Sequence, residues 1–245
     1  KHSIAKTLRG KQSKNFTIPI TKIMKNITLI AICSERDYQK TLKSVEYSIR
    51  NLDFSEVKIV TECNHSHEKI KHFTVDNLNK VEGYNRFCVE QLNNYISTDF
   101  CIVMQWDGFI INPDLWKEEF LQYDYIGAPW DHAISKNRIG NGGFSLRSKK
   151  FLELASKLEY NPKEYYCLYE WQKYDREFSP EDWFVCYGHY EYLKENGIKF
   201  PSVKTASNFS IEHPLPFKSF DRNNIETYKS FGFHGSFNSG AMALL

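Results

Sequence analysis

Two uninterrupted apolar runs constrain the fold of this 245-residue chain more than any other feature. Residues 27–33 (ITLIAIC) and 100–104 (FCIVM) are almost entirely apolar, which is typical of strands buried on both faces of a sheet. Polar residues follow each run at once. Because parallel sheets bind ligands beyond the carboxyl ends of their strands, we expect a binding crevice there.

The segments between these runs alternate between helical and strand patterns. Residues 38–52 and 83–96 place apolar side chains at helical spacing, and residues 57–60 and 71–75 read as short strands. This order implies right-handed crossovers between parallel strands. We therefore predict an α/β fold with a mostly parallel central sheet flanked by helices.

The second half of the chain is rich in Gly, Pro, Trp and Tyr, and it predicts a smaller mixed sheet. We expect a short strand at 144–146 and helices at 149–158 and 181–196. The predicted organisation is a basic, partly disordered arm at 1–25, one domain at 26–237 and a tail at 238–245. The tail has the composition of a fraying end or an expression remnant.

Charge and cysteine usage narrow the function classes. The formal net charge is only +2, and no basic stripe outside the arm suits nucleic acid. The arm itself holds seven Lys or Arg and no acid. This composition is typical of a solvated arm. It also suits a segment that contacts an anionic membrane or another domain of a larger synthase. None of the six cysteines forms a CxxC pair. With no membrane-length apolar run, we expect a protein of the reduced cytoplasm whose membrane contact is limited to the inner face.

Four motifs carry candidate chemistry. The first, Gln105-Trp-Asp107, follows a buried strand, where a carboxylate would meet a hard cation and a diphosphate. The second is the glycine-rich segment 140–148, whose backbone can approach a ligand closely. Both are also ordinary turn sequences, and each taken alone reads better as a turn or a hairpin.

The other two motifs also have structural readings. In Ser179-Pro-Glu-Asp182, Ser179 would cap a helix, and Asp182 would either complement the helix dipole or act as a general base. His234, between aromatic and glycine residues, is either a core histidine or a neutral imidazole ligand. Several aromatics suit sugar stacking, although core packing explains most of them equally well: Trp106, Trp130, Tyr166, Trp171 and Trp183.

Taken in order, these motifs resemble a bacterial family of glycosyltransferase-like domains associated with capsule and polysaccharide synthesis, the DUF5672 type. More distantly the chain resembles the GT-A superfamily. The resemblance rests on QWD at 105–107, YIGAPW at 125–130, GNGGFSLR at 140–147, ED at 181–182 and GFHG at 232–235. It covers residues 26–237 and implies a GT-A-like single domain.

The resemblance implies roles for individual positions. Asp107 matches the last acid of the GT-A Asp-x-Asp motif and, with His234, would hold Mn²⁺ or Mg²⁺. Gln105 departs from that motif, because it stands where the first acid would be and brings no charge. Asp182 matches the catalytic base of inverting members, with Glu181 beside it.

The remaining implied positions bind the donor or line the acceptor side. Asn141, Gly142 and Gly143 belong to the glycine-rich loop. Base, ribose and phosphate contacts are expected from a further group: Cys33, Glu35, Arg36, Thr61, Glu62, Tyr84, Arg86, Gln105 and Trp106. If no metal binds, Arg36, Arg86 or Arg147 would stabilise the phosphate charge instead.

The expected activity is therefore transfer of a sugar from a nucleotide-sugar donor, with a weak preference for a UDP-sugar, to a saccharide or glycolipid acceptor. Two alternatives stay open at this point. One is an inactive carbohydrate- or nucleotide-binding module on the same fold, which the departure at Gln105 favours. The other is a sugar nucleotidyltransferase, which the absence of glycine from residues 33–37 disfavours.

Overall fold

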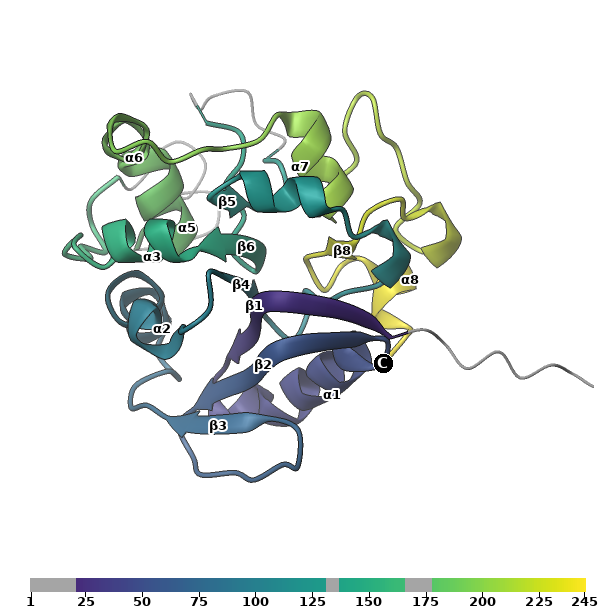
Figure 1. The fold of residues 1–245 in the computed structure, drawn as a ribbon, viewed down its shortest axis with the longest axis horizontal. Coiled ribbons are helices and arrows are strands. Elements are labelled where there is room, and N and C mark those ends of the chain that lie inside the picture. Colours follow the sequence, from purple (N-terminus) through teal and green to yellow (C-terminus); the bar gives the residue numbers. More distant parts are fainter. Residues whose placement is uncertain (1–20, 131–136, 166–177) are drawn as a thin grey trace, which may run out of the picture.

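The fold of this chain is a mixed α/β sheet with helices on both faces, as predicted (Figure 1). A computed structural model describes residues 21–130, 137–165 and 178–245. The six strands are in the order β3-β2-β1-β4-β6-β5; the first four are parallel to one another, and β6 pairs antiparallel with both β4 and β5. Their bounds are β1 Lys22–Ile32, β2 Leu52–Thr61, β3 Lys71–Thr74, β4 Phe100–Met104, β5 Tyr125–Ile126 and β6 Phe144–Ser148.

The apolar run in β1 is buried on both faces, and this explains its uninterrupted hydrophobicity. Leu29 and Ala31 belong to one apolar cluster, and Ile30 and Ile32 belong to another. Helices α1 (Tyr38–Ile49) and α7 (Val203–Phe209) are among the elements that contribute to the first cluster. Others contribute to the second, including α3 (Lys149–Ala155) and α6 (Tyr190–Glu195). Helix α3 begins at Ser148, whose hydroxyl accepts a hydrogen bond from the Phe151 amide.

The two predicted long helices are each interrupted by a π-helical turn. Helix α2 (Val81–Arg86) continues into a π turn at Phe87–Gln91, where the Leu92 amide donates to the Phe87 carbonyl. Helix α5 (Glu181–Trp183) continues into a π turn at Phe184–Gly188 before α6. Each π turn adds a residue to the helical turn and so changes which side chains share a face. The expectation of unbroken helices at 83–96 and 181–196 was therefore wrong.

The chain ends differ from the predicted boundaries. β1 begins at Lys22, inside the predicted arm, and the Lys22 ammonium donates to the Trp116 carbonyl over 3.1 Å. Residues 1–20 lie outside the described residues. The tail does not fray, since Asn238 is buried and helix α8 (Ser239–Met242) inserts Ala241 into the core. Small side chains allow this close packing.

A second, two-stranded sheet lies in the second half of the chain, as expected. β7 (Ser210–Ile211) pairs in parallel with β8 (Gly232–Phe233), and Ile110 bridges to Gly232 from the other side. Glu212 and His234 directly follow these two strands. Because the strands are parallel and in register, these two side chains emerge at the same edge, beside the segment that follows β4.

No helix in the described ranges has the length and apolar character needed to cross a membrane.

Candidate active site

A cavity of about 570 Å³ opens beyond the carboxyl end of β4. It receives side chains from five places: α2, the segment after β4, the glycine-rich loop, the start of α5, and the ends of β7 and β8. The residues that argue for a site are Tyr84, Gln105, Asn141, Gly143, Glu181, Asp182, Glu212 and His234. Trp130 and Trp183 form part of the wall, with their rings 5.2 Å apart. Tyr166 and Trp171 lie outside the described residues.

Gln105 is fixed at the centre of this cavity by both ends of its amide. Its Nε2 donates to the Tyr84 hydroxyl over 2.8 Å, and its Oε1 lies 3.2 Å from Nε2 of His234. Gln105 also starts a tight turn, in which the Gly108 amide donates to the Gln105 carbonyl. The turn directs Gln105 into the cavity, whereas Asp107 is not among the residues that line it.

Asp107 lies beside His234, although the two are 127 positions apart. Its Oδ1 is 3.8 Å from His234 Nε2, and its Oδ2 accepts the Ser236 amide over 3.1 Å. The Asp107 carbonyl also accepts the Gly235 amide. The segment after β8 therefore holds Asp107 by its backbone and by one carboxylate oxygen, and the other oxygen faces the imidazole.

His234 is held from its other side by Glu212. Nδ1 lies 3.0 Å from Glu212 Oε1, and the second carboxylate oxygen accepts the Asn141 side-chain amide over 3.1 Å. Burial alone would lower the pKa of His234, but the hydrogen bond and charge of Glu212, with the charge of Asp107, raise it to about 9.

Asp182 forms the opposite wall and is tied to the glycine-rich loop. Its Oδ2 accepts the Gly142 amide over 2.8 Å, and its Oδ1 accepts the Trp183 amide over 2.7 Å. Burial and the neighbouring charge of Glu181 raise the pKa of Asp182 to about 7, against the lowering effect of these two amides. A carboxyl with such a pKa can exchange a proton near neutral pH.

Glu181 is engaged below the cavity by Arg147. Arg147 Nη2 lies 2.7 Å from Glu181 Oε1, and Nη1 lies 3.2 Å from Oε2. The exposed side-chain fractions are 1% for Arg147 and 5% for Glu181. Because Arg147 is buried in this bidentate pair, it cannot reach a phosphate. Glu181 lies beneath Asp182 and supports it. Ser179, expected to cap α5, makes no capping bond, and Pro180 occupies the cap position instead.

The two central glycines of the loop are required by their surroundings. A Cβ at Gly143 would lie 2.0 Å from His234 Nε2, and a Cβ at Gly142 would lie 2.2 Å from Glu181 Oε1. Both distances are far inside van der Waals contact. The loop therefore packs its bare backbone against the histidine on one side and against the Arg147–Glu181 pair on the other.

The donor atoms at this point suit a divalent cation that is shared with a ligand. Across the described part of the chain, no group of three or more His, Cys, Asp or Glu could hold a metal ion. Asp107, His234 and the Gln105 carbonyl nevertheless face one another, and they supply one carboxylate, one imidazole and one neutral oxygen. Mg²⁺ and Mn²⁺ often take only one or two carboxylates from the protein and complete their shells with phosphate and water. Asp107, Gln105 and His234 are the residues that would meet such an ion, and His234, whose pKa is raised to about 9, would bind it only after losing its Nε2 proton to solvent.

The predicted nucleotide-binding group at β1 and β2 comes together, but outside the 570 Å³ cavity. The Glu35 amide donates to Glu62 Oε2 over 3.3 Å, and His65 Nε2 lies 2.9 Å from Glu35. Cys33 and Thr61 are buried beside them, and burial raises the pKa of the Cys33 thiol. These side chains lie at the same carboxyl edge of the sheet as Gln105.

Three other predicted contacts point elsewhere. Arg86 pairs with Glu82 and Glu90 on its own helical face. The side chain of Arg36 is 88% exposed, and its nearest acid is Asp37. Trp106 lies under the Lys40 ammonium, 4.5 Å from the ring centroid. None of these three lines the cavity.

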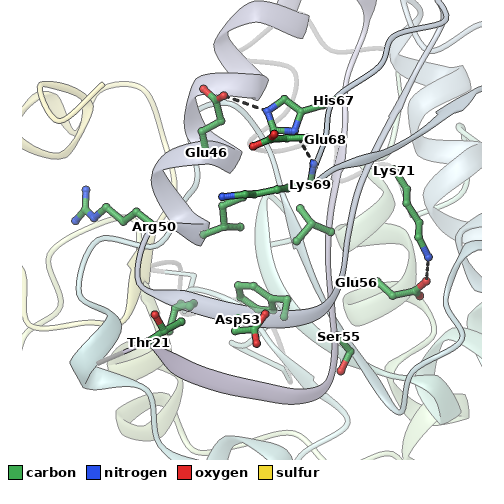
Figure 2. Close-up of a pocket in the computed structure, with 14 residues that line it drawn as sticks. Thr21, Glu46, Arg50, Asp53, Ser55, Glu56, His67, Glu68, Lys69 and Lys71 are labelled. Atoms are coloured by element: carbon green, nitrogen blue, oxygen red, sulfur yellow. Dashed lines mark hydrogen bonds and ion pairs between the residues drawn. The ribbon is translucent and has the colours of Figure 1, made fainter. Parts of the chain in front are cut away.

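A larger surface pocket of about 720 Å³ lies at the other end of the strands (Figure 2). It is formed by the first half of β2, the start of β3 and the end of α1. Figure 2 shows charged side chains of both signs around it, four of which form two pairs, Glu46 with His67 and Lys71 with Glu56. Because it opens at the amino-terminal ends of the strands, it does not share the crevice that holds Asp107 and Asp182.

Sequence reasoning did not select Glu212, Asn85, Phe178 or His213, all of which line the cavity. The signal for Glu212 was a polar pair directly after an apolar residue, Ile211-Glu-His. β7 is only two residues long, and so short a strand gives no periodic pattern to recognise.

Comparisons with known proteins bear on this arrangement. The profile of the family described as "Protein of unknown function (DUF5672)" matches residues 67–234, more than half of the chain. No protein with a curated description matches the sequence.

Among solved structures, the chain is similar to three glycosyltransferases. One is involved in glycosylation of the major capsid of PBCV-1, at 16% identity and TM-score 0.48, covering 89% of this chain and 99% of that one. The galactosyltransferase LgtC, in complex with donor and acceptor sugar analogs, gives 10% identity and TM-score 0.42, covering 85% and 87%. The mannosyltransferase Ktr4p from S. cerevisiae gives 9% and 0.38, covering 64% of each chain.

Proposed function

This chain belongs to the DUF5672 family of proteins of unknown function, and we propose that it is a GT-A-like glycosyltransferase. It would move a sugar from a nucleotide-sugar donor, with UDP-sugars tested first, to a saccharide or glycolipid acceptor. The proposal rests on two sets of side chains on opposite sides of one cavity. His234, with Asp107 Oδ1 3.8 Å from its Nε2, lines one side, and Asp182, with its pKa raised to about 7, lines the other.

Asp182 is the proposed general base. It takes the proton of an acceptor hydroxyl while that oxygen attacks the anomeric carbon of the donor sugar. The bond between this carbon and the diphosphate breaks, and the nucleoside diphosphate leaves with the electron pair. Attack from the face opposite the leaving group inverts the anomeric configuration. The Gly142 amide orients the carboxylate, and the Arg147–Glu181 pair fixes α5 below it.

Asp107, Gln105 and His234 form the proposed diphosphate side. They would hold Mn²⁺ or Mg²⁺, which would neutralise the charge that develops on the departing diphosphate. The group at β1 and β2, with Glu35 and Glu62 at its centre, is proposed to bind ribose and base. In this arrangement the glycine-rich loop separates donor from acceptor. The proposed setting is bacterial surface polysaccharide synthesis at the inner face of the membrane.

The test is to incubate the protein with Mn²⁺ and a panel of UDP-, GDP-, dTDP- and CMP-sugars and to measure release of the nucleotide. Slow hydrolysis of one donor class, or transfer when an oligosaccharide mixture is added, would support the proposal. Release of pyrophosphate from a nucleoside triphosphate and a sugar phosphate would identify a nucleotidyltransferase instead. Tight nucleotide-sugar binding with no turnover under any condition would identify a binding module.

A further inference from the structure

His65 lies flat against Tyr38 at the carboxyl edge of the sheet. His65 belongs to the segment between β2 and β3, and Tyr38 is the first residue of α1. The centroids of the two rings are 3.6 Å apart, and their planes are inclined by only 8°. Tyr38 is 4% exposed, whereas the His65 side chain is 23% exposed. Solvent therefore reaches this stack mainly through the His65 ring.

Both rings are also held at their edges. His65 Nε2 lies 2.9 Å from Glu35 Oε2 and 3.2 Å from Oε1. Because a carboxylate only accepts hydrogen bonds, Nε2 carries the hydrogen of this contact. The Tyr38 hydroxyl lies 3.1 Å from Nε2 of His72, a residue of β3. Contacts with the segment after β1 and with β3 therefore fix the stack.

The spacing of the two rings decides where a planar ligand can go. A ligand ring placed between them would need two van der Waals gaps of about 3.5 Å each, and the 3.6 Å separation holds one. Tyr38 thus occupies the inner face of His65, and the outer face is left for a ligand. Histidine is one of the side chains on which nucleic-acid bases stack. Glu35, which holds the ring, belongs to the same group of residues proposed to bind ribose and base.

We propose that His65 is the residue on which the base of the donor nucleotide stacks, with Tyr38 as the layer behind it. The inference rests on the proposed function for the identity of the ligand. In the alternative arrangement, His65 would swing away and the base would stack on Tyr38 directly. That movement would break both the ring stack and the contact with Glu35. Because every base has a π-face, His65 would select a nucleotide without selecting which base it carries.

The test measures nucleotide binding without metal and without turnover. The probes are UMP, CMP, GMP and dTMP, titrated by calorimetry, with inorganic pyrophosphate as the probe that carries no base. His65→Ala removes the ring, His65→Gln removes the ring but keeps a donor for Glu35, and His65→Phe keeps a ring without that donor. For the nucleotide that binds best, we expect binding to weaken by about tenfold or more in the Ala and Gln variants. We expect nearly unaltered binding in His65→Phe, and unchanged binding of pyrophosphate in all three.

The matched control is His67→Ala. The His67 side chain is 22% exposed, and its Nε2 lies 3.3 Å from Glu46, so it resembles His65 in exposure and in having a carboxylate partner. It lines the pocket at the other end of the strands, and its replacement is expected to leave nucleotide affinity unchanged. Proton NMR gives a readout specific to stacking, because the ring current of His65 shifts the base protons upfield. This shift is expected to persist in the control and in His65→Phe and to shrink in His65→Ala and His65→Gln.

These readouts separate the inference from the function. Equal or tighter nucleotide binding in a folded His65→Ala variant would overturn the inference, and so would a failure of all four nucleotides to bind the unaltered protein. Nucleotide binding that depends on the His65 ring, without transfer from any donor, would support the inference and count against the glycosyltransferase proposal. Transfer with a nucleotide affinity that is the same in every His65 variant would leave the function standing and remove His65 from it.

Discussion

The backbone amide of Gly142 donates a hydrogen bond of 2.8 Å to Asp182 Oδ2 and so joins the glycine-rich loop to the carboxylate at the start of α5. One carboxylate oxygen has two acceptor positions, so this bond orients Asp182 without consuming it. The group retains the capacity to receive a proton from a substrate hydroxyl.

The first prediction concerns Asp182→Asn. The asparagine Oδ1 can still accept the Gly142 amide, but the Trp183 amide then loses its acceptor, so we expect a small loss of stability and an unchanged nucleotide affinity. Because the amide cannot act as a base, we expect kcat to fall by about 10²- to 10⁴-fold. Initial-rate kinetics and a nucleotide titration measure the two effects. Asp114→Asn, at an exposed acid outside the cavity, is the control. Unchanged turnover in Asp182→Asn would remove this residue as the base.

The second prediction is a pH profile. The pKa of Asp182 is raised to about 7, mainly by burial and then by Glu181, and a base works only when ionised. The kcat/KM value for transfer is therefore expected to rise with pH and to level off above about 7. The effect on stability has the opposite sign. Because the folded state holds this proton more tightly than the unfolded state, the associated stabilisation is lost as pH rises through 7. An acidic limb near pH 4 would contradict the assignment.

The third prediction concerns the cation. Treatment with a chelator is expected to abolish transfer, and added Mn²⁺ is expected to restore it. Asp107→Asn removes the anionic ligand, so it should raise the Mn²⁺ concentration for half-maximal rate by about tenfold or more, since ligand charge sets affinity at such sites. A titration of initial rate against free Mn²⁺ measures this. Full activity after exhaustive chelation would mean that the protein alone stabilises the diphosphate.

The fourth prediction concerns stability. Glu181→Gln leaves the Arg147 charge buried without its counter-ion, and this is expected to lower the free energy of unfolding by roughly 3–5 kcal/mol. Glu82→Gln is the matched control, because Glu82 pairs with Arg86 at the surface and its side chain is 56% exposed. A loss of about 0–1 kcal/mol is expected there. Urea unfolding measures both variants.

A double variant tests whether the unpaired Arg147 charge causes the loss of stability in Glu181→Gln. Replacing Arg147 and Glu181 together by Met and Leu removes both charges, so it should destabilise the fold less than Glu181→Gln alone. A larger loss in the double variant would show that packing, and not the unpaired charge, dominates at this position.

The centre of the sheet could be predicted because β1 and β4 are apolar and buried on both faces. β1 and β4 were recognisable from this feature alone, and the bounds of β4 match the prediction. The antiparallel pairing of β6 with β4 was not predictable, since a five-residue strand has the same local pattern in either direction. Pairing direction depends on the path of the whole chain.

The candidate site was predictable only in part, for a similar reason. Asp107, Asp182 and His234 stand within distinctive local sequences; the cavity joins Asp182 and His234, and Asp107 contacts His234 from outside the lining. Glu212 has no such local signal. Arg86 was expected from the family resemblance to contact the base, the ribose or, without a metal, the phosphate, and in the structure it pairs with Glu82 and Glu90, one turn away on each side.

The two π turns have a consequence for how relatives of this protein can differ. Each one directly follows a short helix that carries cavity residues, Tyr84 in α2 and Asp182 in α5. Deleting a single residue from either turn would restore an ordinary helix and rotate everything beyond it by about 100° around the helix axis. Length changes in homologues should therefore be rare at 87–91 and 184–188, and an alignment gap there would mark a protein whose pocket is built differently.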